Sequence, residues 1–386
     1  MKFRKLHIEH LDADIEISSF GTGLEVSEWH VMIHVTPMGD GFPGQHARLC
    51  QAARMLQDMP GMQGATPIFK RYFLSDSTNQ QPLMDTEGEC CTVSCIQQPP
   101  LDGSKVALWM YLMRGVQAET IRCEGATTTI ARHGGYEHMW TMGMTCGQGD
   151  SYGQTEALLD TYQRILNGQG ADIQANCIRT WFFVRDVDTQ YQGLVAARRD
   201  AFSRIGLTSD THYIASTGIG GNPADTRSLV QMGCYAVKGL CHGQQRYLYA
   251  PTHLNRTYEY GVTFERGTLV RYGDRNHAYI SGTASIDNKG NVVHLGNVRE
   301  QTLRMWENVS ALLREAGMTM DDMAHAIVYL RDIADHETVR CMFAERFPDV
   351  PTVITLAPVC RPTWLIEMEC VAIKEASDEN KGLDNL

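Results

Sequence analysis

Two glutamates occupy alternate positions in the apolar segment Trp364-Leu-Ile-Glu-Met-Glu-Cys-Val-Ala-Ile-Lys374. Alternate residues of a strand share a face, so Glu367 and Glu369 are expected to lie side by side. Burial near Leu365 and Val371, together with the second carboxylate, opposes ionisation of Glu367 and raises its pKa. A carboxylic acid that stays protonated near neutral pH is suited to general-acid catalysis. The alternative is a glutamate pair on the wet face of a strand.

Three further features have side chains suited to holding a small polar ligand. The segment Ser281 to Thr283 offers backbone N–H groups and hydroxyls at a strand end, although Gly282 also permits plain close packing. Tyr260 precedes a glycine and is either a substrate-orienting group or a turn residue. Arg361 is either a bidentate carboxylate clamp or an exposed loop charge.

Metal and cofactor motifs are missing from the sequence. The twelve cysteines contain no CxxC pair, and the histidines show no paired spacing, so we expect buried reduced thiols and no metal site. There is also no phosphate-cradling glycine loop and no dinucleotide fingerprint. We therefore expect no cofactor.

An internal repeat supplies the elements that must position these side chains. Val-Tyr-Leu-Arg-Asp, ending at Asp332, recurs as Phe-Phe-Val-Arg-Asp ending at Asp186 and as Tyr-Phe-Leu-Ser-Asp ending at Asp76. The segment 364–374 is likewise paralleled by Ser228-Leu-Val-Gln-Met-Gly-Cys-Tyr-Ala-Val-Lys238. A recurring unit of this kind predicts three repeats, with bounds at 1–120, 121–245 and 246–376 and a disordered tail at 377–386.

Hydrophobic periodicity predicts the elements of each repeat, in the order ββ, α, β, α, ββ for the third. In the third repeat we expect a strand at 278–286, a short strand after the turn Asn288-Lys-Gly290, and strands at 324–330, 352–356 and 365–374. We expect its helices at 301–316, with Gly317 at the C-terminal end, and at 335–346. In the second we expect strands at 139–145, 178–184 and 228–238, and helices at 154–166 and 190–204. In the first we expect strands at 29–35, 69–74 and 105–113, a helix at 45–59, and a second helix that is short or missing.

These elements predict an α+β fold in which helices cover one face of each mixed sheet. The opposite faces can then cover each other around a pseudo-threefold axis, so that one chain imitates a trimer. Aligning the repeats places Leu108, Gln231 and Glu367 at one position. Only the third repeat therefore carries a proton donor there, and we expect a single working cleft.

Composition limits the classes of partner. The formal charge of −11 opposes binding to nucleic acid or to an anionic membrane, but it permits a locally basic pocket for a small anionic metabolite. The N-terminal residues do not resemble a signal peptide, and no segment is apolar enough to span a bilayer. We expect a cytoplasmic protein, either a monomeric pseudo-trimer or a homo-oligomer.

The third repeat resembles the RidA (YjgF) family. The resemblance rests on Ile280-Ser-Gly-Thr, the helix start Gln301-Thr302, the segment 328–332, and Ile366-Glu-Met-Glu-Cys-Val-Ala372. It implies the fold of a family that forms homotrimers with sites between subunits. Many members are enamine or imine deaminases that use an arginine near the start of the penultimate strand. That position is Val350 here, which disfavours ordinary deamination.

Residues 180–375 also resemble the chorismatases, single-chain relatives with the same fold. The matching segments are Ala197-Arg-Arg-Asp-Ala-Phe202, Ala215-Ser-Thr-Gly-Ile-Gly-Gly221, Tyr260-Gly261 with Phe264-Glu-Arg266, Ser281-Gly-Thr-Ala-Ser-Ile286, and Cys360-Arg-Pro-Thr-Trp-Leu-Ile-Glu367. The resemblance implies removal of pyruvate from chorismate, with Glu367 as the general acid. Cys360 marks the branch that yields 3-hydroxybenzoate, unless it is one more buried thiol.

One departure concerns the anion-binding residues. The family's "PRSP" stretch, which holds an arginine, has no counterpart between Gly261 and Phe264. Arg256, Arg266 and Arg271 are nearby replacements, and we expect Arg266 or Arg271 to be the clamp. Two alternatives to a chorismatase-like enzyme stay open, namely a RidA-type enamine or imine deaminase and a non-catalytic ligand-binding protein.

Overall fold

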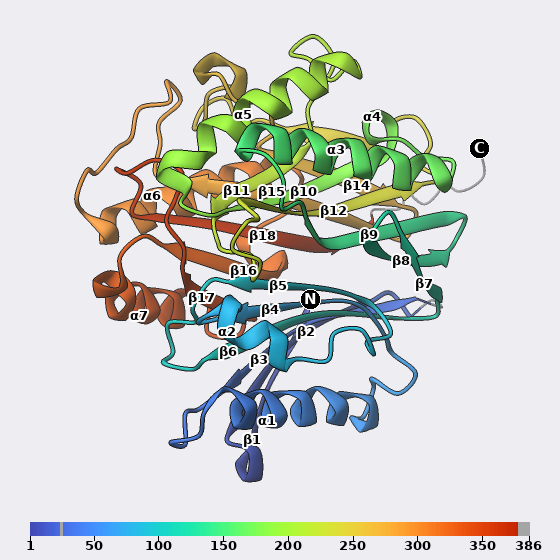
Figure 1. Ribbon diagram of the computed structural model, residues 1–386, viewed down its shortest axis with the longest axis vertical. Coiled ribbons are helices and arrows are strands. Elements are labelled where there is room, and N and C mark those ends of the chain that lie inside the picture. Colours follow the sequence, from blue (N-terminus) through green and yellow to red (C-terminus); the bar gives the residue numbers. More distant parts are fainter. Residues whose placement is uncertain (24–25, 377–386) are drawn as a thin grey trace.

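The computed structural model describes residues 1–23 and 26–376, so the predicted disordered tail at 377–386 lies outside the described residues. Three six-stranded sheets follow one another along the chain (Figure 1). Numbered within its own sheet, each has the strand order 1-2-3-6-4-5. The fourth and fifth strands pair in parallel, and all other neighbours pair antiparallel. The predicted threefold repeat is confirmed.

The first sheet is built from residues 2–114. Its strands are β1 (Lys2–Ile8), β2 (Ala13–Gly21), β3 (Ser27–Val35), β4 (Thr66–Leu74), β5 (Thr92–Gln97) and β6 (Val106–Arg114). Helix α1 (Phe42–Met55) connects β3 to β4. The second helix of this repeat is reduced to the single turn α2 (Ser77–Gln80), as the sequence indicated.

The second sheet uses residues 117–238. Its strands are β7 (Gln117–Cys123), β8 (Ala126–His133), β9 (Tyr136–Thr145), β10 (Cys177–Val184), β11 (Ala215–Gly220) and β12 (Val230–Lys238). Its helices are α3 (Ser151–Gly168), the short α4 (Ile173–Asn176) and α5 (Val187–Arg204). Asp150 begins α3 by accepting the Gly153 N–H with its side chain, which is an ordinary N-cap.

The third sheet uses residues 245–375. Its strands are β13 (Gln245–Leu248), β14 (Gly267–Tyr272), β15 (Arg275–Ala284), β16 (Met323–Leu330), β17 (Thr352–Leu356) and β18 (Ile366–Glu375). Its helices are α6 (Val298–Glu315) and α7 (His336–Arg346). Gly317 follows α6 with a φ of +76°, in the left-handed region that suits a glycine at the end of a helix.

The predicted order of elements was wrong at the start of each repeat. A hairpin precedes the early strand, giving βββαβαββ, and the residues after the Asn288–Gly290 turn form only the isolated bridge Ile286↔Val292. The missed hairpin strands differ in pattern, since β2 alternates buried and more exposed residues from Ala13 to Ile17 and carried a usable strand signal. Strand β7 is exposed or half-buried along its whole length.

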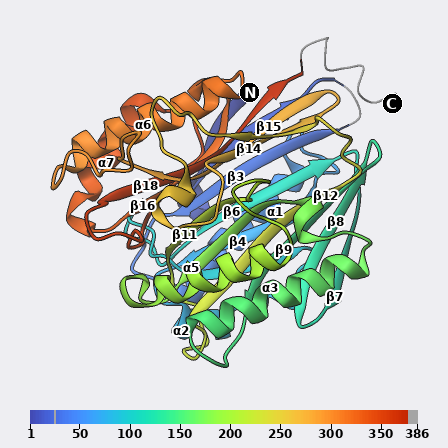
Figure 2. The same cartoon turned by 90° about the horizontal axis from the view of Figure 1, so that it is seen from above.

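Helices cover the outer face of each sheet, and the three inner faces meet at the centre (Figures 1 and 2). The inner faces are rich in aromatic residues that touch across the repeats. Within the second repeat, Trp140 and Tyr235 stack with ring centroids 4.0 Å apart. The ring of Phe69 in the first repeat lies 4.8 Å from that of Trp140, and the ring of Tyr279 in the third lies 5.3 Å from that of Tyr235. The α+β pseudo-trimer is therefore confirmed.

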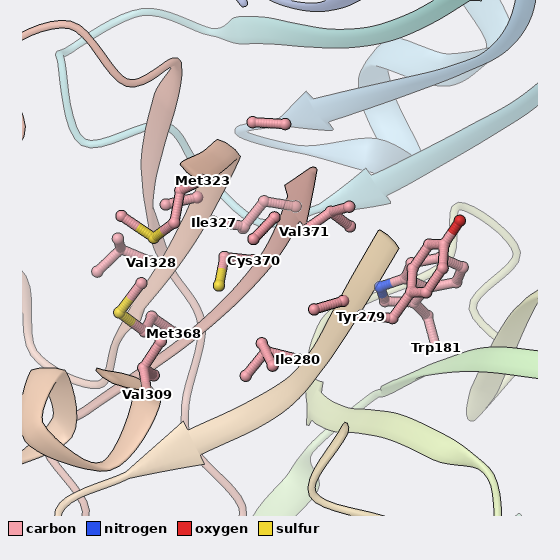
Figure 3. Packing of buried hydrophobic residues seen from close by; sticks show 14 of the residues in the cluster. Trp181, Tyr279, Ile280, Val309, Met323, Ile327, Val328, Met368, Cys370 and Val371 are labelled. Atoms are coloured by element: carbon pink, nitrogen blue, oxygen red, sulfur yellow. The ribbon is translucent and has the colours of Figure 1, made fainter. Parts of the chain in front are cut away.

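The third repeat illustrates how one strand separates the two faces (Figure 3). Met368 and Cys370 lie with Val328 and Val309 of α6, on the helix-covered side, whereas Tyr279 lies toward Trp181 of the second repeat. Glu367 and Glu369 alternate with Met368 and therefore face the centre. None of the helices in the described part of the chain is both long and apolar enough to cross a membrane.

Strand register corrects one equivalence between the repeats. Glu367 pairs with Tyr329, and Gln231 pairs with the corresponding Phe183. In the first repeat the corresponding Phe73 pairs with Ala107, whereas Leu108 lies one residue further on and packs on the helix side. The prediction of Leu108 was therefore wrong by one residue, because a one-residue slip in a strand exchanges its faces. Glutamate, glutamine and alanine occupy the shared position.

Candidate active site

A cavity of about 740 Å³ lies between the second and third repeats. The second repeat supplies residues of α5 and β11, and the third supplies residues of β15, β18 and the loops before β14 and β18. The side chains used below that line it are Tyr191, Arg198, Arg199, Ser216, Tyr260, Phe264, Arg266, Cys360, Arg361, Trp364 and Glu367. Glu367, Cys360, Tyr260, Arg266, Gly282 and Arg361 from the sequence-predicted set therefore meet at one place.

Glu367 forms part of the cavity wall and is only 4% exposed. Burial raises the pKa of its carboxyl to about 8, and the Glu369 carboxylate on the same strand face adds to this effect. Arg179 and Arg266 act in the opposite direction but do not outweigh desolvation. At neutral pH the group is therefore a carboxylic acid, able to donate a proton into the cavity.

Glu369 is held by hydrogen bonds and ion pairs and does not line the cavity. It accepts hydrogen bonds from Arg179 Nη2 and Trp181 Nε1, both at 2.8 Å, and from the Thr217 hydroxyl. Arg71 of the first repeat lies 3.7 Å away, stacked between aromatic rings. Two guanidinium groups therefore lie beside Glu369, and repulsion from Glu369 adds to the larger effect of burial in raising the pKa of Glu367.

Two arginines flank Tyr260 at the cavity. The guanidinium carbons of Arg266 and Arg361 lie 5.4 and 5.1 Å from the centre of its ring. Arg266 is 3% exposed and is held by Asn255, to whose backbone oxygen Nε and Nη2 donate at 3.2 and 3.1 Å. Arg361 is exposed and also lies over Trp364, at 5.3 Å. A buried guanidinium held by hydrogen bonds and a more exposed one therefore lie at the same cavity.

Arg198 is the main site residue that sequence reasoning missed. It projects from α5, is 1% exposed, and donates to Thr263 Oγ1 at 3.2 Å and to Ser216 Oγ at 3.3 Å. Its Nη2 atom is buried and has no hydrogen-bond partner within the described residues. The available signal was the segment 197–202, which matched a family pattern without pointing to a single side chain.

Cys360 lines the cavity as a partly buried thiol beside Glu367 and Tyr191. Burial raises the pKa of this thiol to about 12, and the Glu367 carboxylate contributes in the same direction. The sulfur is therefore protonated at neutral pH. It can donate a weak hydrogen bond or a proton, but it is not poised as a nucleophilic thiolate.

The segment Ser281 to Thr283 contributes space rather than ligand-binding groups. The N–H of Ser281 donates to the Arg266 carbonyl, and that of Gly282 donates to Thr217 Oγ1 at 3.0 Å. The Ser281 hydroxyl donates to the Glu265 carbonyl at 2.6 Å, and the Thr283 hydroxyl donates to the Ser281 carbonyl. A Cβ at Gly282 would lie 2.0 Å from Glu367 Oε1, so the glycine makes room for the acid.

Two arginines considered as clamps lie elsewhere. Arg271 projects from β14 and reaches only the Gly243 carbonyl, at 3.5 Å. Arg256 lies over Tyr249, with its guanidinium carbon 3.8 Å from the ring centre. Its Nη2 atom lies 4.0 Å from Glu265 Oε1. Neither lines the cavity, so Arg266 is the buried cation that the structure brings to Glu367.

Comparison with known proteins places the chain in a family. Residues 268–374 match the family model described as Endoribonuclease L-PSP. A RutC family protein of Pyrococcus abyssi is 33% identical over 102 residues, which are 26% of this chain and 80% of that protein. Another, from Saccharolobus solfataricus, is 36% identical over 107 residues, covering 27% and 83% of the two chains. The chain belongs to the RutC family.

The whole fold has a more extensive counterpart among solved structures. The crystal structure of a chorismatase covers 81% of this chain and 95% of its own, with a TM-score of 0.64 and 20% identity. The two proteins therefore share the fold. The likeness extends well beyond the 107 residues of the family match, across all or part of more than two repeats.

Proposed function

We propose that this protein removes pyruvate from chorismate, or from a similar small carboxylate that carries an enolpyruvyl ether. The observation that carries the proposal is a protonated Glu367 in the wall of a cavity lined by arginines. Such a cavity attracts an anion and offers it an acid, which is what acid-catalysed cleavage of an anionic enol ether requires.

The chemistry starts with proton transfer from Glu367 to the methylene carbon of the enol ether. The ether carbon then becomes an oxocarbenium-like centre that water, or a group of the substrate itself, attacks. With water, the resulting hemiketal releases pyruvate and leaves a dihydroxycyclohexadiene carboxylate. Attack and rearrangement within the ring would instead lead to a hydroxybenzoate, and the protonated Cys360 thiol is placed to assist that branch.

The cations match a substrate with two carboxylates. Arg198, Arg199, Arg266 and Arg361 all line the cavity, whereas Glu367 carries no charge at neutral pH. Arg266 lies near the acid and is suited to the enolpyruvyl carboxylate. Arg198, with its unpartnered Nη2, is suited to the ring carboxylate, because a buried guanidinium gains most from a charged acceptor.

The same cavity weighs against the two alternatives. Convergent arginines facing an acid are not expected of a protein that kept the fold and lost its ligand. For a RidA-type deaminase, the position of the expected arginine is Val350, which is buried and does not line this cavity. Neither alternative accounts for a glutamate kept neutral beside four guanidinium groups.

Product analysis tests the proposal. Purified protein is incubated with chorismate, and pyruvate is measured with lactate dehydrogenase while the ring product is identified by NMR. We expect pyruvate and one ring product in equal amounts. If pyruvate stays at the uncatalysed level while an enzymatically generated imino acid releases ammonia, the deaminase alternative replaces the proposal.

The rate of pyruvate release is expected to fall as the pH rises through about 8. The acid form of Glu367 is the active one, and its pKa is raised to about 8, so activity is present below that pH and lost above it. Between pH 7 and pH 9 the protonated fraction falls roughly tenfold for such a pKa. Measuring kcat/KM from pH 6 to pH 10 checks this, and a rate that rises over this range contradicts it.

Gly282→Ala is expected to lower pyruvate release at least tenfold with a small loss of stability. The added Cβ would lie 2.0 Å from Glu367 Oε1 and 3.2 Å from Thr217 Cγ2, so the carboxyl must leave its position. A displacement of about 1 Å at a reacting group costs on the order of 10²-fold. Gly168→Ala, at the end of α3, is the matched control, because its Cβ would meet open space. Full activity of Gly282→Ala would mean that the position of Glu367 is unimportant.

A further inference from the structure

A cavity of about 590 Å³ lies between the first and third repeats. The third repeat supplies residues of α7 and β17, and the first supplies residues of β1, β2, β3 and the loop before β6. The candidate active site uses the matching helix and fifth strand of the second repeat, α5 and β11, with the third strand of the third repeat, β15. The two cavities are therefore counterparts at different junctions. We call this one the histidine cleft, because His7, His34 and His336 line it.

An ion pair between His34 and Asp102 forms part of the wall of the histidine cleft. Nδ1 of His34 lies 3.0 Å from Asp102 Oδ2, and the other oxygen of that carboxylate accepts the Ser104 N–H at 2.9 Å. The adjacent Leu101 N–H donates to the Ile354 carbonyl of β17 at 3.0 Å, which holds the loop against the third repeat. His34 is thus held through Nδ1, and its Nε2 atom has no hydrogen-bond partner among the described residues. A ligand in the cleft can therefore bond to Nε2 without displacing a protein group.

The imidazole of His34 is positively charged at neutral pH. Burial lowers its pKa, but the hydrogen bond and the charge of Asp102, with contributions from Glu16 and Asp14, raise it to about 9. Both ring nitrogens then carry hydrogen, so Nε2 is a charged donor. His336 lines the same cleft from α7 and is neutral, because burial lowers its pKa. The cleft therefore offers a ligand an imidazolium N–H from His34.

The other carboxylates that line the histidine cleft already have partners. Asp14 Oδ1 lies 2.9 Å from Nδ1 of His7, and Glu16 accepts hydrogen bonds from Lys5 Nζ at 2.6 Å and from the Thr352 N–H at 2.9 Å. In the part of the chain that the structure describes, no group of three or more histidine, cysteine, aspartate or glutamate side chains is arranged to hold a metal ion. A cation is therefore a poor match for the cleft, whereas an anion meets a charged donor.

The remaining wall of the histidine cleft is apolar on one side and basic at its edge. Leu6, Ile15 and Ile354 line it from β1, β2 and β17. Arg340 lines it from α7, with half of its side chain exposed. The Nε and Nη2 atoms of Arg340 donate to Glu337, which leaves Nη1 for another acceptor. An apolar surface beside two cationic donors suits an organic anion with a compact apolar body.

We propose that the histidine cleft binds a small organic anion such as an aryl carboxylate. The carboxylate accepts the Nε2–H of His34, with Arg340 as the second cation, and the apolar body packs on the apolar wall. The cleft lies at a different junction of repeats from Glu367, so binding there does not depend on the proposed reaction.

Benzoate is the probe, added to the native full-length protein with isotopic labels at the histidine Cε1 and tryptophan Nε1 atoms. The His34 signal in the NMR spectrum is assigned by its loss in His34→Gln. At pH 7 we expect benzoate to shift this signal saturably and to leave the signal of the exposed His242 in place. Trp364 reports separately on the candidate active site, which it lines. A shift confined to Trp364 would contradict binding in the histidine cleft and leave the proposed function intact.

The pH dependence of the affinity tests the charge on His34. The imidazolium is present below a pKa of about 9 and is lost as the pH rises through it. The affinity for benzoate, read from the His34 signal, is therefore expected to hold from pH 6 to pH 8. Above pH 9 it is expected to fall roughly tenfold for each pH unit, because only the protonated form donates from Nε2.

Asp102→Asn removes the charge that raises the pKa of His34 and keeps the size of the side chain, so the fall in affinity is expected to move to lower pH. Asp210→Asn, at an exposed aspartate of the second repeat, is the matched control and should leave that limit in place. Both variants keep His34 and its signal, so the test does not depend on the folding of His34→Gln. A His34 signal that benzoate leaves unmoved at pH 7, or the same pH limit in Asp102→Asn and the wild type, would overturn the proposal.

Discussion

Replacing Glu367 with glutamine is expected to lower pyruvate release from chorismate by about 10²–10⁴-fold, the usual contribution of a general acid. The amide keeps the shape of the side chain but has no proton acidic enough for an enol ether. Folding should be little affected, because at neutral pH a neutral acid is replaced by a neutral amide. Initial rates with saturating chorismate, measured beside the thermal midpoint of both proteins, check the prediction.

Gln231→Asn is the matched control for this variant, since Gln231 is the residue of the second repeat at the same position. Its activity is expected to stay within about twofold of the wild type. Gln231 lines a different cavity, between the first and second repeats, and that cavity has no part in the proposed reaction. Comparable losses in the two variants would mean that the repeats contribute equally, which contradicts a single working cleft.

Glu369→Gln is expected to reduce the free energy of unfolding by about 3–5 kcal/mol, the usual cost of removing one partner of a buried ion pair. Glu369 is 2% exposed and is the carboxylate that Arg71 and Arg179 share. Without it, two buried guanidinium groups lose their counter-charge, and three hydrogen bonds to its oxygens weaken or break. Urea unfolding followed by tryptophan fluorescence measures the effect.

Glu337→Gln serves as the control, because Glu337 also pairs with an arginine, Arg340 at 2.7 Å, but on the surface of α7. Because solvent screens an exposed pair, this variant should differ little in stability from the wild type. A second expected effect would show that Glu369 does more than stabilise the fold. Loss of its charge should lower the pKa of Glu367 and move the alkaline limit of activity to lower pH. Equal stabilities of the two variants would mean that the buried arginines do not need Glu369.

The third repeat was predictable from the sequence because its local signals agree. Helix α6 has an apolar stripe and a following glycine, and the helices and strands from residue 298 onward lie within a few residues of the predicted bounds. In strand β18, Glu367 and Glu369 lie on the same face, as predicted. The burial of Glu367 followed from the alternation of apolar and polar residues around it.

Other features depend on contacts that no local pattern records. Arg198 lies 169 positions before Glu367 and reaches the cavity only because the second sheet packs against the third. Leu108 looked equivalent to Glu367 because the first repeat has diverged, and only strand pairing shows that Ala107 holds that position. The backbone N–H groups of Ser281 and Gly282 resembled a free anion site until their acceptors were known.

Comparison of the repeats leads to a single chemical asymmetry. The same fold position carries alanine, glutamine and glutamate in successive repeats, and four arginines line the cavity that holds the glutamate. The cavity between the first and second repeats, which Gln231 lines, has one arginine, Arg122, among its lining residues, together with Cys91, Cys95 and Cys123. The three repeats therefore carry different side chains at equivalent positions, and the proposed catalytic function belongs to the third repeat.

The protonation state of Glu367 is the central claim, and infrared difference spectroscopy measures it directly. Spectra of the wild type at pH 6.5 and pH 9.5 are compared with those of Glu367→Gln. The account predicts a carboxylic acid C=O band that disappears with a midpoint near pH 8 in the wild type and is missing from the variant. If the wild type and the variant give the same difference spectrum over this range, Glu367 is already ionised at neutral pH and is not the proton donor.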